Sequence, residues 1–187
     1  MEDNLKSSLN EGEKILWTGN AEPFETLDQT HKKNFIIKAI IGAAIVLAFT
    51  ILLLSIGSSN SKTLILIVII LLLCAIPSIN VFSDASKLRK IKYYATTERL
   101  IVFRDSVKSA YYSQIKTGAF KEDQDGHVSL LCGSDAIKAK PHKRREICVV
   151  GANETDSGSE IDRFCFYAPT DRKTLEKILH EKMPSVF

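Results

Sequence analysis

The sequence predicts an α+β membrane protein in which a transmembrane hairpin of two helices is followed by a seven-stranded antiparallel β-barrel and a C-terminal capping helix. Three observations lead to this prediction. Two long uncharged apolar runs lie close together, short runs of alternating character follow them, and one amphipathic stretch closes the chain. Long apolar runs are typical of membrane spans, and short alternating runs between turn residues are typical of antiparallel strands.

The two apolar runs cover residues 39–57 and 63–83, and neither contains a charged residue. A bilayer core about 30 Å thick needs roughly 20 apolar residues of helix to cross it, so both runs are long enough. A cleaved signal peptide would begin near residue 1, whereas about thirty mostly polar residues precede the first run. The sequence therefore predicts two membrane crossings.

Basic residues set the expected orientation of these spans. His31, Lys32, Lys33 and Lys38 precede or enter the first run, and Lys87, Arg89, Lys90 and Lys92 follow the second. The short connection between the runs holds one base, Lys62, so the positive-inside rule predicts that both termini are cytoplasmic in a multi-pass cell-membrane protein. The predicted divisions are a lead at 1–34, spans at 35–57 and 63–83, an external loop at 58–62 and a cytoplasmic domain at 84–187.

Seven short strands are expected in the cytoplasmic domain, at 91–96, 99–103, 107–112, 115–121, 128–132, 146–150 and 161–167. The pair Asp125-Gly126 between two of them is a strong hairpin signal. Thr96 and its neighbours predict another tight reversal, with hydroxyls bonding to the local backbone. This spacing favours a small sandwich or barrel.

A single helix is expected after Pro169. Thr170 is the predicted N-cap, and Asp171 would favour the helix dipole from the first turn. Leu175, Ile178 and Leu179 recur at helical spacing, which predicts that this helix packs one apolar face on the barrel.

Several motifs carry a family resemblance. The stretch 9–19 (LNEGEKILWTG) and Pro23 stand before the apolar runs, and 93–102 (YYATTERLIV) and 112–115 (YSQI) stand after them. In this order the motifs resemble bacterial membrane proteins that carry a pleckstrin-homology-like domain, although Thr97 stands where that family more often has Asn or Asp. The resemblance implies a pleckstrin-homology-like barrel that serves as an adaptor.

The densest charge run, 138–145, is the candidate contact site for a partner or headgroup. A polybasic loop attracts anionic lipid, although a solvated loop between strands is the simpler interpretation. The resemblance also implies that a base near the first hairpin can meet a lipid phosphate, whereas the simpler interpretation of that base is structural. The candidate residues are Lys138, Lys140, Lys143, Arg144, Arg145 and Arg99.

No enzyme motif occurs in the sequence, so no catalytic residue and no cofactor are expected. Cys132, Cys148 and Cys165 are expected to be reduced thiols, and with His127 and His142 they match no usual zinc spacing. A net charge of +3 is too small to argue for nucleic acid.

Two functions remain open. The first is a membrane-anchored adaptor or binding module that docks an unknown protein partner or anionic lipid headgroups at the cytoplasmic face. The alternative is a small oligomeric transport or permeability component formed by the hairpin. The lack of a polar stripe in either apolar run counts against that alternative.

Overall fold

Two segments that lie far apart in the sequence build one domain. The computed structural model describes residues 5, 8–55, 61–150 and 159–187. Met1–Phe24 and Asp84–Phe187 together form one unit, which we call the globular domain, and Glu25–Ser83 forms a second, which we call the helical unit. The helical unit is therefore an insertion in the globular domain.

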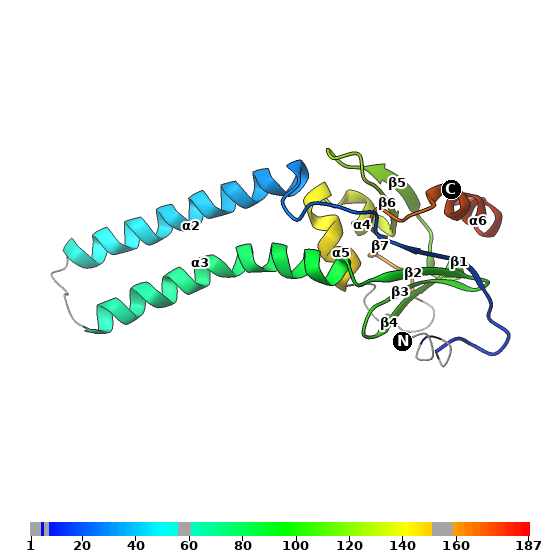
Figure 1. Cartoon of the computed structure of the whole chain (residues 1–187), viewed down its shortest axis with the longest axis horizontal. Coiled ribbons are helices and arrows are strands. Elements are labelled where there is room, and N and C mark those ends of the chain that lie inside the picture. The colour runs from blue at the N-terminus through cyan, green and yellow to red at the C-terminus, as the bar shows by residue number, and fades with distance from the viewer. Residues whose placement is uncertain (1–4, 6–7, 56–60, 151–158) are drawn as a thin grey trace. The chain divides into compact units, whose positions relative to one another are not determined.

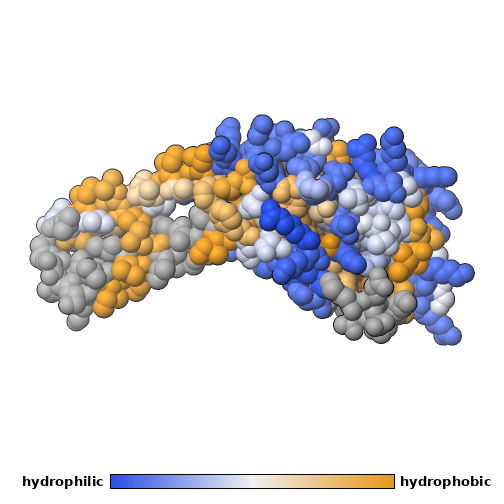
Figure 2. Space-filling view, viewed as in Figure 1, coloured by the Kyte–Doolittle hydropathy of each residue, from blue (hydrophilic) through white to orange (hydrophobic). Residues whose placement is uncertain are grey.

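The helical unit consists of α2 (Gln29–Ser55) and most of α3 (Ser61–Leu88), which lie side by side in Figure 1. The rings of Phe35 and Phe82 meet edge to face, with centroids 6.1 Å apart. Large apolar side chains are exposed along both helices and appear in orange in Figure 2. Within the described residues, Gln29–Leu53 is the one stretch long and apolar enough to cross a membrane, and only 6 % of its most apolar part is buried. Such exposure does not fit the core helix of a soluble protein.

The first helix begins earlier than the predicted span at 35–57. It starts at Gln29, because Asp28 caps it: the Asp28 carboxylate accepts a hydrogen bond from the backbone N–H of His31 at 2.9 Å. Of the predicted external loop at 58–62, the last two residues begin α3 and the others lie outside the described residues.

Four strands form an antiparallel sheet in the order β1-β2-β3-β4. They are β1 (Ile15–Asn20), β2 (Lys92–Thr96), β3 (Arg99–Phe103) and β4 (Val107–Tyr111). The sequence predicted the last three strands and missed β1, which comes from the N-terminal lead. Trp17 of β1 pairs with Ala95 of β2. The two strands are neighbours in the sheet, although the inserted helical unit separates them in the sequence.

The turn between β2 and β3 forms as predicted. The hydroxyl oxygen of Thr96 accepts hydrogen bonds from the backbone N–H groups of Glu98 at 3.2 Å and Arg99 at 3.0 Å. A side-chain oxygen thus satisfies two backbone donors that a tight reversal would otherwise leave unpaired.

A second antiparallel sheet has the order β5-β6-β7, with β5 (Gly118–Glu122), β6 (Val128–Cys132) and β7 (Phe164–Phe166). The predicted Asp-Gly turn closes its hairpin: Gly126 has a φ of +82° and donates its N–H to the carbonyl of Asp123. The Asp123 carboxylate also accepts the N–H of His127 at 3.0 Å.

The described strands therefore form two sheets of four and three strands, and not one closed barrel. The predicted strand at 146–150 is wrong, because α5 (Arg144–Val150) occupies it, after α4 (Ser134–Lys138) and the short 3₁₀ turn η2 (Pro141–Lys143). Arg145 and Cys148 are both buried, and a spacing of three residues on one face is helical. An isolated bridge between Ala21 and Pro169 links the end of β1 to the segment after β7.

The main core is aromatic and contains the single tryptophan. Trp17 is 5 % exposed and stacks on Phe166 with ring centroids 6.1 Å apart, and Tyr93 stacks on the same ring at 4.6 Å. β1 is thus held in the domain by packing as well as by backbone pairing.

The C-terminal helix α6 (Arg172–Lys182) packs Leu175 and Leu179 into this core, and both are fully buried. Its N-cap is Asp171, with a φ of +50°, and not the predicted Thr170. Thr170 instead accepts the backbone N–H of Asn20 at 3.1 Å, so it fastens β1 and does not cap the helix.

Candidate membrane-facing and binding surfaces

The basic segment 138–145 divides into an exposed and a buried part. Lys138 ends α4, Lys140 precedes η2 and Lys143 ends η2, and all three side chains are exposed. Arg144 and Arg145 begin α5 and are only 4 % and 2 % exposed. The segment therefore offers three lysines, and not five bases, to an external ligand.

Both buried arginines have protein partners. Arg144 donates from Nη1 to the backbone carbonyl of Lys121 at 2.9 Å. Arg145 donates to the hydroxyl of Tyr167 at 3.2 Å, and its guanidinium lies 4.2 Å from the ring centre of Phe24. These contacts fix α5 to β5 and to the segments next to β1 and β7.

Charged groups of η2 and α5 lie close to the end of α3. The pKa of Asp84 is raised, chiefly by burial; Lys87 and Lys143 oppose this increase, and Glu146 adds to it. Lys143 also pairs with Glu146, with 2.6 Å between Nζ and Oε2. Asp84 directly follows the apolar run at 63–83 in the sequence, so the exposed Lys143 acts electrostatically on the first residue after that run.

Arg99 lies elsewhere, at the start of β3 in the four-stranded sheet, and is 7 % exposed. It donates from Nε and Nη2 to the two carboxylate oxygens of Glu13, both at 3.0 Å, and from Nη2 to the carbonyl of Ser8 at 2.7 Å. These contacts support the structural interpretation of Arg99, because its guanidinium binds Ser8 and Glu13 of the N-terminal lead.

The Glu13 carboxylate has further donors. Thr96 donates to it at 2.6 Å and the backbone N–H of Asn10 at 2.8 Å. Burial alone would raise the pKa of Glu13, but the hydrogen bonds from Arg99, Thr96 and Asn10 outweigh it and lower the pKa. The sequence motif gave no sign of this pairing, which joins residues 86 positions apart.

The cysteines lie in the main core. Cys132, Cys148 and Cys165 are free and fully buried, and the Cys148 sulfur lies 3.3 Å from the Tyr93 hydroxyl. Burial raises the pKa of Cys132 well above that of an exposed thiol. Within the described part of the chain, no three His, Cys, Asp or Glu side chains converge as metal ligands do.

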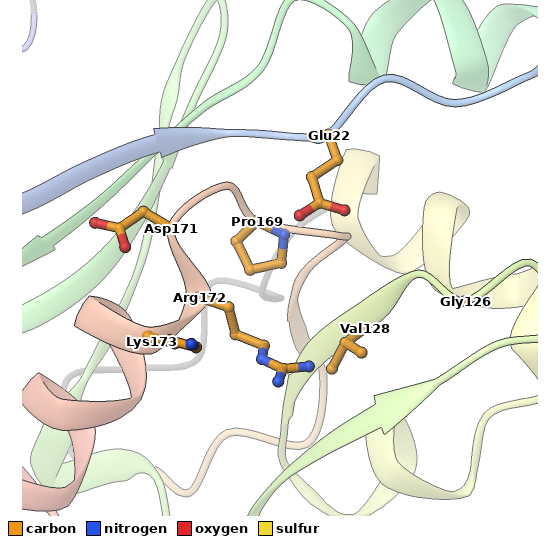
Figure 3. Close-up of a pocket in the computed structure, with 7 residues that line it drawn as sticks. All are labelled: Glu22, Gly126, Val128, Pro169, Asp171, Arg172 and Lys173. Atoms are coloured by element: carbon orange, nitrogen blue, oxygen red, sulfur yellow. The ribbon is translucent and has the colours of Figure 1, made fainter.

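An open pocket of about 320 Å³ lies at the start of α6 (Figure 3). Acids and bases both line it, and Arg172 extends toward Val128 across it. Arg172 is also paired with Glu176, with 3.1 Å between Nε and Oε1. The sequence did not predict this pocket, because its lining comes from three separate segments: Glu22, then Gly126 and Val128, then Pro169, Asp171, Arg172 and Lys173.

No protein-family model matches the chain, and no curated protein or solved structure is significantly similar to it. The likeness to pleckstrin-homology-like proteins therefore stays a hypothesis, and the functional argument depends on the geometry of the chain itself.

Proposed function

We propose that this protein is a membrane-anchored binding module. In this proposal α2 and α3 both cross the membrane, and the globular domain lies on the cytoplasmic side. Its exposed lysines Lys138, Lys140 and Lys143 contact anionic lipid headgroups.

The pairing of β1 with β2 is the observation that carries the proposal. β1 ends at Asn20, before the helical unit, and β2 begins at Lys92, after it, yet both belong to one sheet. Strands of one sheet must lie on the same side of a membrane, so the chain between them crosses it an even number of times. If the apolar stretch Gln29–Leu53 crosses once, α3 must cross back.

The same pairing counts against a cleaved signal sequence. Cleavage after α2 would separate β1 from the rest of the domain and remove Trp17 from the aromatic core. The apolar run at 63–83 is long enough for the return crossing, since 21 helical residues span about 30 Å.

The side of the membrane follows from the bases that flank the helices. Lys32, Lys33 and Lys38 stand at the start of α2, whereas Lys87 and Lys90 stand at the end of α3 or just after it. When loops are short, the cytoplasmic ends of membrane-spanning helices carry an excess of Lys and Arg.

Headgroup contact is supported by the exposure of Lys138, Lys140 and Lys143 and by the electrostatic effect of Lys143 on Asp84, the first residue after the apolar run. A base near an anionic membrane surface contributes about 1 kcal/mol of binding free energy, so three lysines together supply about 3 kcal/mol. This attraction acts within about 8 Å at physiological ionic strength, which confines it to residues close to the surface.

The crossing pattern is tested with single cysteines in the full chain, in a background where Cys74 is replaced by Ser. Ser59→Cys lies between the two apolar runs, and Ser106→Cys lies in the exposed β3–β4 turn. We expect an impermeant maleimide to label the first in intact cells and the second only after permeabilisation. Labelling of both, or of neither, in intact cells would contradict the two-span orientation.

Headgroup contact is tested with the full chain in nanodiscs, with an environment-sensitive dye on Ala139→Cys. We expect the dye emission to shift to shorter wavelength in anionic discs relative to phosphatidylcholine discs, and the shift to vanish in high salt. The triple change of Lys138, Lys140 and Lys143 to Glu should also remove it.

A matched control makes the same charge change on α6, at the exposed residues Lys173, Lys177 and Lys182. The control should keep the full shift, because only lysines near the membrane surface contribute. An equal response in anionic and neutral discs would contradict the lipid proposal and favour a protein partner.

A further inference from the structure

The three exposed lysines of the basic segment differ in what they contact. Among the residues that the structure describes, Lys138 and Lys140 have no acidic partner, whereas Lys143 is paired with Glu146. The Nζ atom of Lys143 lies 2.6 Å from the Oε2 atom of Glu146, which makes this a short, charge-assisted hydrogen bond. One of the three bases is therefore already bound to an anion of the chain itself.

The first turn of α5 places Glu146 at this position. Glu146 is the third residue of α5, and it follows Lys143, the last residue of η2, by three positions. Because η2 runs directly into α5, this spacing brings the two side chains together on one helical face. The side chains of Lys143 and Glu146 are 48 % and 50 % exposed, so an external ligand can reach the pair.

The exposure of this pair allows Lys143 to change its partner. Water and salt compete with an exposed ion pair, which therefore contributes little to stability. The pair of Arg99 and Glu13 differs in this respect, because both of its side chains are buried. An ammonium binds phosphate as a point charge, without the fixed geometry of a guanidinium. A headgroup phosphate can therefore take the place of the Glu146 carboxylate at Lys143.

Asp84 shows that the charge of Glu146 acts beyond this ion pair. The pKa of Asp84 is raised chiefly by burial; the negative charge of Glu146 raises it further, and Lys143 lowers it. The three charged groups therefore form one interacting set in the globular domain. A negative charge in this set opposes the approach of an anionic surface, whereas the three lysines favour it.

We propose that Glu146 sets the density of anionic lipid at which the globular domain contacts the membrane, because it holds Lys143 until headgroup phosphates replace it. This inference rests on the proposed headgroup contact and names the residue that regulates it. In this proposal Lys138 and Lys140 alone meet a weakly charged membrane, and all three lysines meet a strongly charged one.

The test measures how much anionic lipid the contact requires. The full chain with the dye on Ala139→Cys, and with Cys74 replaced by Ser, is placed in nanodiscs with increasing fractions of phosphatidylglycerol in phosphatidylcholine, at one salt concentration. We expect Glu146→Gln to reach half of the emission shift at a lower phosphatidylglycerol fraction than the parent. The free energy of an exposed ion pair corresponds to an increase of about two- to fivefold in the equilibrium constant for contact.

Two controls separate the release of Lys143 from a general change of charge. Glu176→Gln removes the same charge from a paired carboxylate on α6, where Oε1 lies 3.1 Å from Nε of Arg172, and it should leave the midpoint of the parent unchanged. In a chain that carries Lys143→Gln, the change Glu146→Gln should have at most about half of its effect on the equilibrium constant, expressed as a logarithm, because no lysine remains to be released.

The fluorescence of Trp17, which is buried in the main core, shows whether each variant is folded. A folded parent that gives no response to phosphatidylglycerol would overturn the proposed headgroup contact and this inference with it. A parent that responds, together with a Glu146→Gln variant of unchanged midpoint, would overturn this inference alone. An equal effect of Glu146→Gln with and without Lys143 would also overturn it, since Glu146 would then act only through its charge.

Discussion

Replacement of Glu13 by Gln should destabilise the globular domain substantially. The Glu13 side chain is fully buried, and that of Arg99 is 8 % exposed, so the pair is shielded from water. Glu13 accepts hydrogen bonds from Arg99, Thr96 and the backbone of Asn10. Gln keeps the shape of Glu but leaves the guanidinium without a counter-charge.

Breaking one partner of a buried ion pair costs about 3–5 kcal/mol, and Gln should lie near the lower end because its amide oxygen still accepts a hydrogen bond. For a domain of this size, 3 kcal/mol corresponds to a decrease in melting temperature of about 10 °C. Glu13→Leu combined with Arg99→Met should be less destabilising than Glu13→Gln, because no uncompensated charge remains.

Fluorescence of the single tryptophan provides the assay, since Trp17 is buried in the main core and would become exposed on unfolding. Thermal unfolding of the full chain in detergent would be compared for the parent, Glu13→Gln and the exposed control Glu11→Gln. The control should stay within about 0.5 kcal/mol of the parent. If Glu13→Gln unfolds together with Glu11→Gln, the ion pair does not stabilise the globular domain, and this reasoning is refuted.

Three further predictions use the same fluorescence assay. The pKa of Glu13 is lowered in the folded state, so the stability that its carboxylate gives the domain is complete above the ordinary value of 4.5 and is lost as the pH falls below it. The difference in stability between the parent and Glu13→Gln should therefore shrink in acid. Gly133→Ala should destabilise strongly, since a Cβ there would overlap the carbonyls of Ile161 and Asp162, whereas Gly12→Ala, also at positive φ but in open space, should cost only about 1 kcal/mol. Leu175→Asp should cost more than Ile178→Asp, because Leu175 is fully buried and Ile178 only partly. Equal melting within either pair would contradict the packing described here.

Strands with strong local signals could be predicted from the sequence. β2, β3 and β6 are short apolar runs bounded by turn residues, and the side chains of Thr96 and Asp123 close the adjoining turns. α6 followed from the helical spacing of Leu175 and Leu179. In each of these elements the determining contacts lie within a few residues.

Elements that depend on distant partners could not be predicted. β1 contains exposed Ile15 and Leu16 and three small or polar residues, so its pattern alone does not indicate a strand. Its pairing with β2 is not visible in local sequence. The strand prediction at 146–150 is wrong because the four consecutive apolar residues 147–150 fit a strand as well as a partly buried turn of helix.

For the same reason, the sequence could not show which bases of the candidate segment 138–145 are exposed. A run of bases in the sequence gives no information on which of them are buried. Arg145 is held by Phe24 and Tyr167, which lie far from it in the chain, so only the fold separates the buried arginines from the exposed lysines.

The insertion of the helical unit also constrains how the domain folds. Glu13 and β1 are synthesised before α2, whereas β2 and Arg99 follow α3, and Glu13 and Arg99 are 86 residues apart. The four-stranded sheet can therefore close only after both long helices have been made. If only one of the two helices crossed the membrane, Trp17 and its partner Phe166 would lie in different compartments and could not pack together. Closure of the sheet around Trp17 would thus depend on correct insertion of both helices.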